Sequence, residues 1–273
     1  MNEIYKGYKI ISDDQEISNF YSFDLLNEVP HENQYILIDN KDGNYDKFIY
    51  QDGKFKRIRA YSIQNSITGK IKARNPYQSI AIDLLQDDSI PVKVLTGVYG
   101  SAKTFFMVNA ALGKIEQGIY DKLIFVRNGL SPKGVPDIGH LPGTAEEKTI
   151  RWALPIADAL GGQEMLESFI HAGKIEVQPM NFLRGRDFKH SIVFCDESEN
   201  LTKNLFQLLL GRIGEGSALY IAGDYRQCDL SKNFSEGLTL LCDKLRGERL
   251  FGVVDMPVTE RSTIANLSNL LDE

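Results

Sequence analysis

The chain has 273 residues, 42% hydrophobic and 25% charged, a composition typical of globular proteins and a length that suits one large domain plus a small one. The net charge of -6 excludes a polycationic nucleic-acid binder, so any such binding must come from local patches or a subunit channel. No run of about eighteen apolar residues is present, so we expect no membrane span.

The cysteines and the N-terminal residues indicate the cellular compartment in which the protein works. The three cysteines, Cys195, Cys228 and Cys242, have no C-x-x-C spacing, which argues against a disulfide framework or a zinc site. The N-terminal residues are polar and acidic rather than basic and then apolar, unlike a secretory signal. We therefore expect a protein of the reducing cytoplasm.

Short apolar runs separated by Asp-Gly turns characterise residues 35–61, which follow a polar stretch. The runs YILID, KFIY and KFKRIRAY predict three short strands. Three strands form only a small sheet, which must pack against something larger. The polar stretch SIQNSITGKIKARN predicts a connection. We expect a small N-terminal antiparallel β element over residues 1–72 and the main domain over residues 73–273.

Strands and helices alternate from Asn75 onward. Helical spacing of apolar residues covers 76–86, 101–118 and 201–213. Compact apolar runs predict strands at 91–97, 121–128, 174–180, 190–197 and 217–224. Such alternation predicts an α/β fold with a mainly parallel sheet covered by helices on both faces.

The segment TGVYGSAKTFF, residues 96–106, nearly spells the phosphate-binding pattern G-x-x-x-x-G-K-[ST]. It lies between a strand and a helix, where backbone N–H groups and the helix N-terminus can hold phosphate. Lys103 would reach the phosphates and the Thr104 hydroxyl would ligate Mg²⁺. The predicted nucleotide-contacting residues of this loop are Gly97, Val98, Tyr99, Gly100, Ser101, Ala102, Lys103, Thr104 and Phe105.

Ala102 departs from the pattern, because glycine is usual before the lysine. We expect Ala102 to lie in the first helical turn with negative φ, where a methyl group costs little. The alternative for the whole segment is a glycine-containing turn with a chance Lys-Thr pair.

Acidic residues end the strand HSIVFCDE, and they point to the second half of a nucleotide site. Ligands of open α/β sheets bind at the carboxyl ends of strands, where Asp196 and Glu197 fall. Asp196 would hold Mg²⁺ through water, and Glu197 would activate the attacking water. Without the upstream loop, the pair would read as two solvated acids.

Three further residues are candidates that carry little weight individually. Gln227, in AGDYRQCDL, would sense the γ-phosphate, although a polar turn is the plain alternative. Gln78 would pair with adenine through its amide, or else lie on a helix surface. Arg261 would stabilise charge in the transition state, or else cap a helix.

Together these segments resemble the PhoH family of P-loop ATPases, which is related to superfamily 1 helicase motors and has a RecA-like fold. The resemblance runs from about Ala73 to Leu271 and is carried by RNPYQ, GVYGSAKT, LIFVRN, DIGHLPGTAEEK, FLRGRDF, IVFCDESEN, GRIGEGS, AGDYRQCDL and ERSTIANLSNLL. Residues 35–61 resemble the segment that joins a PIN nuclease domain to PhoH. Only a short stretch precedes them, so no nuclease activity is implied.

The resemblance implies ATP binding and Mg²⁺-dependent hydrolysis, with RNA or another single-stranded nucleic acid as partner and a homo-oligomer, often a hexameric ring. Residues that match its motif positions are Gln78, Lys103, Thr104, Asp196, Glu197, Gln227 and Arg261. Arg184, Arg186 and Arg212 also match family arginines, which implies contact with nucleic acid or with the nucleotide of a neighbouring subunit.

The sequence departs from the family pattern at Ala102, at Asn128 in place of a proline, and at Ser198 and Glu199, which change DEAQN to DESEN. These changes bear on turnover more than on fold. Three hypotheses therefore stay open: a nucleic-acid-stimulated motor, a weakly hydrolysing nucleotide switch or assembly module, and a phosphotransferase supported by the loop alone.

Two basic segments, KFKRIRAY and RGRDFKH, are the local candidates for nucleic-acid contact. The first equally suits a charged edge strand that discourages aggregation. Neither contains the stacked aromatic residues of a dedicated single-strand platform.

Overall fold

A computed structural model describes residues 4–23, 26–127, 153–227 and 237–260. Its centre is a six-stranded sheet of order β12-β7-β11-β10-β8-β9, in which all neighbouring strands are parallel. The strands are β7 (Val92–Gly97), β8 (Lys122–Arg127), β9 (Ile175–Pro179), β10 (Ser191–Asp196), β11 (Ala218–Gly223) and β12 (Phe251–Met256). Five of them were predicted in sequence. The expected α/β class is confirmed.

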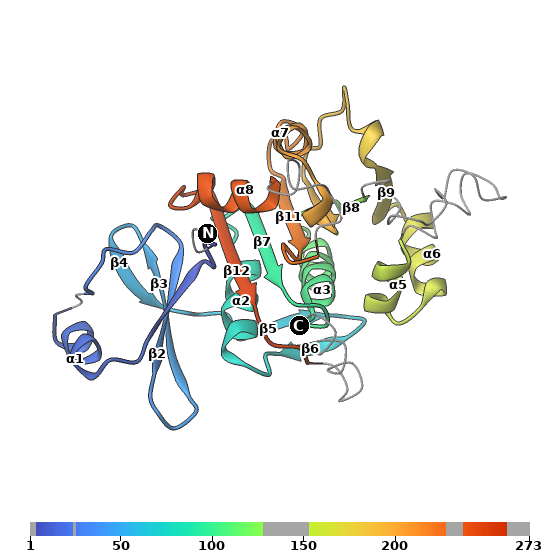
Figure 1. Ribbon diagram of the computed structural model, residues 1–273. Helices are drawn as coiled ribbons and strands as arrows, with labels where there is room; N and C mark the ends of the chain where they lie inside the picture. Colours follow the sequence, from blue (N-terminus) through green and yellow to red (C-terminus); the bar gives the residue numbers. More distant parts are fainter. Residues whose placement is uncertain (1–3, 24–25, 128–152, 228–236, 261–273) are drawn as a thin grey trace.

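Helices cover both faces of this sheet (Figure 1). One face packs against α2 (Pro76–Gln86), α3 (Lys103–Glu116), α5 (Leu154–Leu160) and α6 (Gln163–His171). The other face packs against α7 (Lys203–Leu210) and α8 (Gly237–Leu245). Successive strand residues alternate between the two cores, as Phe194 and Val193 do, which explains why the strands are apolar throughout. None of the helices described is long and apolar enough to cross a membrane.

A second sheet precedes the main one and lies beside it in Figure 1. Its order is β1-β2-β3-β4, and its elements are β1 (Tyr8–Ile11), α1 (Asp14–Phe23), β2 (Gln34–Asp39), β3 (Tyr45–Gln51) and β4 (Lys54–Arg57). The three strands from β2 to β4 are antiparallel, as predicted, whereas β1 pairs with β2 in parallel. Helix α1, which the polar sequence did not reveal, packs through Phe20 on Ile36 and Phe48.

The expected connection after β4 is instead a hairpin of β5 (Ser62–Asn65) and β6 (Gly69–Lys72). Its polar residues form the turn, because Asn65 Oδ1 accepts hydrogen bonds from the backbone N–H groups of Ile67 and Thr68. The hairpin lies against α3, where a Cβ atom at Gly113 would come within 2.4 Å of the Gln64 carbonyl oxygen. The polar composition therefore reflected turn chemistry and not an unstructured link.

Candidate nucleotide site

The predicted phosphate loop joins the end of β7 to the start of α3. Gly97 has φ +129°, and a Cβ atom there would come within 2.2 Å of the Met256 carbonyl oxygen on β12. Glycine is therefore required at this position, both for the positive φ and for the close approach of the β12 backbone. The same carbonyl accepts a 3.2 Å hydrogen bond from Val98 N, so the loop begins in contact with the end of β12.

Ala102 does not have the negative φ expected from the sequence. It precedes the first helical residue and lies in the left-handed region, at φ 76° and ψ 23°. The expectation was wrong because Ala102 occupies the N-cap position and not the first turn. An L-residue pays about 1–2 kcal/mol in this conformation, whereas glycine does not. The alanine methyl group packs against the main core together with Phe105.

Lys103 turns its ammonium group back into the loop. Its Nζ donates hydrogen bonds to the carbonyl oxygens of Gly97, at 2.7 Å, and Val98, at 3.0 Å. Burial lowers the pKa of Lys103, and the negative charges of Asp224 and Asp196 oppose that shift. The ammonium thus lies inside the curve of the loop, among carboxylates from the neighbouring strand ends.

Thr104 and Asp196 meet between α3 and β10. Thr104 Oγ1 donates a 3.0 Å hydrogen bond to Asp196 Oδ2, and the N–H of Glu197 donates one of 3.0 Å to Asp196 Oδ1. Burial raises the pKa of Asp196, and these two hydrogen bonds counteract it. A hydroxyl and a single carboxylate are oxygen ligands of the kind Mg²⁺ takes beside phosphates and water, so the pair fits that ion.

No group of three or more His, Cys, Asp or Glu side chains in the described ranges could hold a metal by itself. Ser101, also in the loop, has a buried hydroxyl for which the described residues provide no hydrogen-bond partner. It is a donor that a phosphate oxygen could satisfy.

Glu197 is paired with Arg127, a residue that the sequence did not single out. The Arg127 guanidinium contacts both carboxylate oxygens, through Nη2 to Oε1 and through Nε to Oε2 at 3.3 Å. Arg127 ends β8 and lies opposite Asp196 in the register of the sheet. Glu197 itself has φ 51°, the left-handed conformation, which aims its side chain away from the line of β10.

Glu199, in the short 3-10 helix η3 (Ser198–Asn200), ties the end of β10 to that of β11. Its Oε2 accepts a 3.0 Å hydrogen bond from Asp224 N. Burial raises the pKa of Glu199 to about 7, with the charges of Glu197 and Asp196 adding to the shift. Gln227 follows in the same turn, its N–H bonded to the Asp224 carbonyl oxygen and its side chain exposed.

Gln78 lies against the loop from the first turn of α2. Its buried amide accepts a 2.8 Å hydrogen bond from Arg74 N and places Nε2 3.5 Å from the Ser101 carbonyl oxygen. Asn75, the helix N-cap, contacts Glu260 Oε1 through Nδ2 at 2.6 Å. The predicted adenine-reading segment is therefore adjacent to the phosphate loop.

The segment after β12 runs along the same loop. Thr259 Oγ1 donates to the Tyr99 carbonyl oxygen at 2.9 Å, and Glu260 N donates to that of Gly100 at 3.2 Å. Arg261, the next residue, lies outside the described residues, as do Asn128 and the segment DIGHLPGTAEEK. The described part of the chain thus reaches the loop one residue before the predicted arginine.

Of the three other predicted arginines, Arg184 and Arg186 follow β9, the edge strand farthest from β12, and Arg212 follows α7. Arg186 forms a 2.8 Å ion pair with Glu176 and lies 4.9 Å from the centre of the Phe188 ring. Arg212 Nη1 donates to the Arg186 carbonyl oxygen at 3.3 Å. Arg184 is exposed. Two of the three arginines are therefore engaged in internal contacts.

A parallel sheet, a phosphate loop holding a partly buried lysine, and an aspartate bonded to the loop threonine define a P-loop protein of the ATPase type. The family described as "PhoH-like protein" matches residues 70–266. The chain therefore belongs to the PhoH-like protein family.

Among curated relatives, the chain is 30% identical to Protein PhoH2 of Bacillus subtilis (strain 168), over 98% of this chain and 64% of the relative. It is 32% identical to Protein PhoH2 of Mycolicibacterium smegmatis, over 74% of this chain and 48% of the relative. The chain thus spans between about half and two thirds of the length of these relatives. A solved structure, the Pif1 helicase from Candida albicans, matches with 14% identity and a TM-score of 0.39, over 74% of this chain and 44% of that one.

Proposed function

We propose that the protein is an Mg²⁺-dependent ATPase, a helicase-type motor stimulated by RNA or another single-stranded nucleic acid. The observation that carries the proposal is the Thr104–Asp196 hydrogen bond beside Lys103, whose ammonium is turned into the loop. In this proposal residues 73–273 form the ATPase domain, residues 1–72 form an accessory β element, and the chain assembles as a homo-oligomer, such as a hexameric ring. The buried free thiols of Cys195 and Cys242 suit the reducing cytoplasm.

Phosphate binding would use contacts that the loop now makes with itself. Lys103 Nζ would exchange the carbonyl oxygens of Gly97 and Val98 for phosphate oxygens, which carry a full negative charge. Loop N–H groups and the N-terminus of α3 would add further donors. Thr104 and Asp196 would hold Mg²⁺, which when bound neutralises charge on the phosphates. Gln78 would read the base beside Ser101.

Glu197 would accept a proton from the attacking water, whose oxygen joins the γ-phosphorus as ADP leaves. Arg127 holds the Glu197 carboxylate at two points, so it acts as a positioning residue for that base. Gln227 would orient the water or sense the γ-phosphate, and Arg261 would stabilise the charge that develops during transfer. Both assignments rest on motif position in the sequence.

The deciding experiment is the ATPase rate measured with RNA, with single-stranded DNA and with no nucleic acid. We expect Mg²⁺-dependent hydrolysis that a polynucleotide stimulates and that Lys103→Ala abolishes. An equal rate in all three conditions would remove the nucleic-acid part of the proposal. Hydrolysis that survives Lys103→Ala would remove the assignment of the site.

A second candidate is a nucleotide-binding switch or oligomer-assembly module with negligible turnover. Two observations favour it: the left-handed strain at Ala102 and a Lys103 ammonium already bonded to the loop's own carbonyls. Glu197→Gln discriminates between the candidates. In a motor it should trap ATP and abolish hydrolysis, whereas in a switch it should leave nucleotide-dependent assembly and the low rate unchanged.

A further inference from the structure

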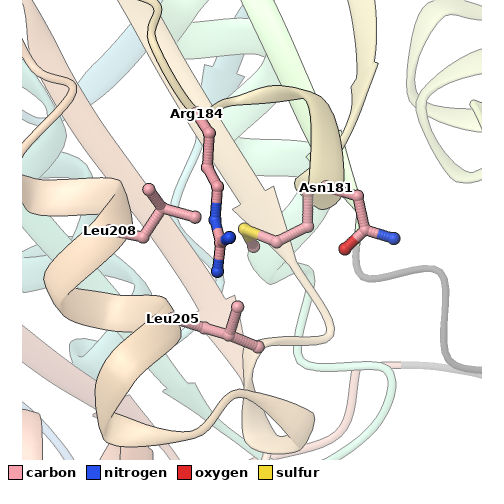
Figure 2. Close-up of a pocket in the computed structure, with 5 residues that line it drawn as sticks. Asn181, Arg184, Leu205 and Leu208 are labelled. Carbon is pink, nitrogen blue, oxygen red and sulfur yellow. The ribbon is translucent and has the colours of Figure 1, made fainter.

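A pocket of about 280 Å³ lies between α7 and the 3-10 helix η2 (Met180–Phe182), and none of its lining residues belongs to the phosphate loop. It is lined by Met180, Asn181, Arg184, Leu205 and Leu208 (Figure 2). Helix η2 begins directly after β9, and α7 follows η3 at the end of β10. Because β9 and β10 are parallel to β7, η2 and the start of α7 lie toward the same ends of the strands as the phosphate loop.

The walls of the pocket combine apolar and polar groups in a way that suits a flat heterocycle. Met180, Leu205 and Leu208 supply the apolar surface. In Figure 2 the Arg184 side chain extends between Leu208 and Asn181, with its guanidinium toward Leu205. Within the described part of the chain, no hydrogen bond or ion pair engages the side chains of Asn181 and Arg184. An amide and a guanidinium are thus available to a ligand.

Phe182, the residue after Asn181 in the chain, is an exposed aromatic side chain. Its side chain is 68% exposed, although its neighbour Leu183 is fully buried and anchors the turn in the core. The sequence showed no aromatic platform at the RGRDFKH patch, yet the structure exposes this ring two residues before Arg184. Exposed rings and guanidinium planes are the surfaces on which unpaired bases stack.

Two other arginines, Arg186 in the same loop and Arg212 after α7, make contacts at the loop that carries Arg184. Arg186 is fixed by Glu176 and by the Phe188 ring, and Arg212 bonds to the Arg186 carbonyl oxygen. Arg184 is the member of the set left facing solvent.

We infer that this pocket binds one base of a single-stranded nucleic acid, with Asn181 and Arg184 bonding to the base edge and Phe182 stacking on an adjacent base. The inference rests on the proposed function, and it names a site at which the nucleic acid would contact the protein. Ligand pockets generally begin near 300 Å³, so the volume suits a single ring system better than a larger molecule. The positive charge of Arg184 complements the phosphates that accompany a base.

The first test measures base stacking. Fluorescence anisotropy would give the affinity for labelled oligouridylate and oligothymidylate and for an abasic oligodeoxynucleotide of equal length, without ATP. We expect Phe182→Ala to weaken binding of the base-bearing strands about tenfold, or about 1.4 kcal/mol, and to leave abasic binding unchanged. The matched control is Phe23→Ala, which removes a ring of 70% exposure from α1 and should change neither affinity.

The second test addresses Arg184. Arg184→Ala should weaken binding of base-bearing strands and lower the salt dependence, while Arg184→Lys restores the salt dependence but not the affinity, because lysine lacks the planar fork. Arg249→Ala is the matched control. That side chain is 80% exposed and precedes β12, the outermost strand on the side of the sheet away from β9. Its loss should leave both the affinity and the salt dependence unchanged.

Four outcomes would overturn the inference. Wild-type affinity in both the Phe182 and Arg184 variants would do so while leaving the ATPase proposal intact. Equal affinity for abasic and base-bearing strands would exclude base recognition. If either variant dissociates the oligomer in mass photometry and oligonucleotide affinity is unchanged, the pocket is a subunit interface. If the wild type binds no oligonucleotide but hydrolyses Mg-ATP in a reaction that requires Lys103, both this inference and the nucleic-acid part of the proposed function are wrong.

Discussion

Thr104 Oγ1 and Asp196 Oδ2 are 3.0 Å apart, although 92 residues separate them in the sequence. The bond connects the first turn of α3 to the last residue of β10, and so connects the phosphate loop to the acidic strand end. It forms because β10 lies in the same parallel sheet as β7, two strands along, with its carboxyl end at the same edge. The fold itself therefore brings the two groups together.

Replacing Thr104 tests whether this hydroxyl serves a metal ion. Thr104→Ala should weaken Mg²⁺ affinity about tenfold or more, because one oxygen ligand is lost and Asp196 loses a donor. Thr104→Ser keeps the hydroxyl and should stay close to the wild type. The check is the ATPase rate titrated with Mg²⁺. Equal Mg²⁺ dependence in the alanine and serine variants would contradict the assignment.

Ala102→Gly should relieve the left-handed strain at the loop. The relief of about 1–2 kcal/mol is partly offset by the greater freedom of glycine in the unfolded chain, about 0.4–1 kcal/mol, so a small net gain in stability is expected. Ala102→Val, with a branched Cβ at positive φ, should destabilise the protein. Urea unfolding measures both changes. A glycine variant clearly less stable than the wild type would show that the methyl packing outweighs the strain.

Arg127→Ala should act through Glu197. Without the two-point contact the carboxylate loses its orientation, and kcat should fall by about tenfold to a hundredfold, with the KM for ATP little changed. Arg127→Lys should recover only part of this loss, since an ammonium cannot make the bidentate contact. Steady-state measurement of kcat and of the KM for ATP in both variants tests this prediction. A raised KM with normal kcat would place Arg127 in ATP binding instead.

Glu199 should make stability depend on pH. Its pKa is raised from 4.5 to about 7 in the folded protein, so between these values the folded state keeps a proton that the unfolded chain has lost. Stability therefore falls as pH rises through this range. Glu199→Gln does not titrate and can still accept the Asp224 N–H bond. Its advantage in free energy of unfolding over the wild type should grow from near pH 5 to near pH 8, reaching at most about 3 kcal/mol.

Denaturant unfolding at several pH values measures this difference. The matched control is Glu248→Gln, a change at an exposed glutamate, which should show no growing advantage. A wild type and Glu199→Gln variant with parallel stability profiles would mean that Glu199 is ionised throughout, and that its burial is compensated by contacts other than the Asp224 N–H.

The parts of the site that sequence reasoning located follow their own strands directly. Lys103 and Thr104 come just after β7, and Asp196 and Glu197 end and follow β10, so a local pattern of strand and polar residue was sufficient. The pairing of Arg127 with Glu197 was missed because it depends on β8 lying beside β10, which spacing does not reveal. The available signal was a charged residue ending an apolar strand, as Asp196 does.

The sequence also failed to predict the backbone conformation at Ala102 and two elements made mostly of polar residues, the β5–β6 hairpin and helix α1. The sign of φ at Ala102 depends on which residue begins α3, and helix boundaries are the least certain part of a sequence prediction. The sequence predicts a connection where the β5–β6 hairpin lies, because Asn65 and its neighbours are polar. In the structure Asn65 both shapes the turn and bonds to Asn109 on α3. Helix α1 buries only Glu16 and Phe20, and most of its other residues are polar.

The contacts between residues 256–260 and the phosphate loop fix the length of that segment. Met256, Thr259 and Glu260 meet three successive loop residues through hydrogen bonds of 2.9–3.2 Å. If one residue were inserted or deleted between Met256 and Thr259, Met256 could still bond to Val98. Thr259 and Glu260 would then no longer face Tyr99 and Gly100. Natural variation in chain length should therefore be tolerated in surface turns such as Asp42–Asn44, but not in this five-residue stretch.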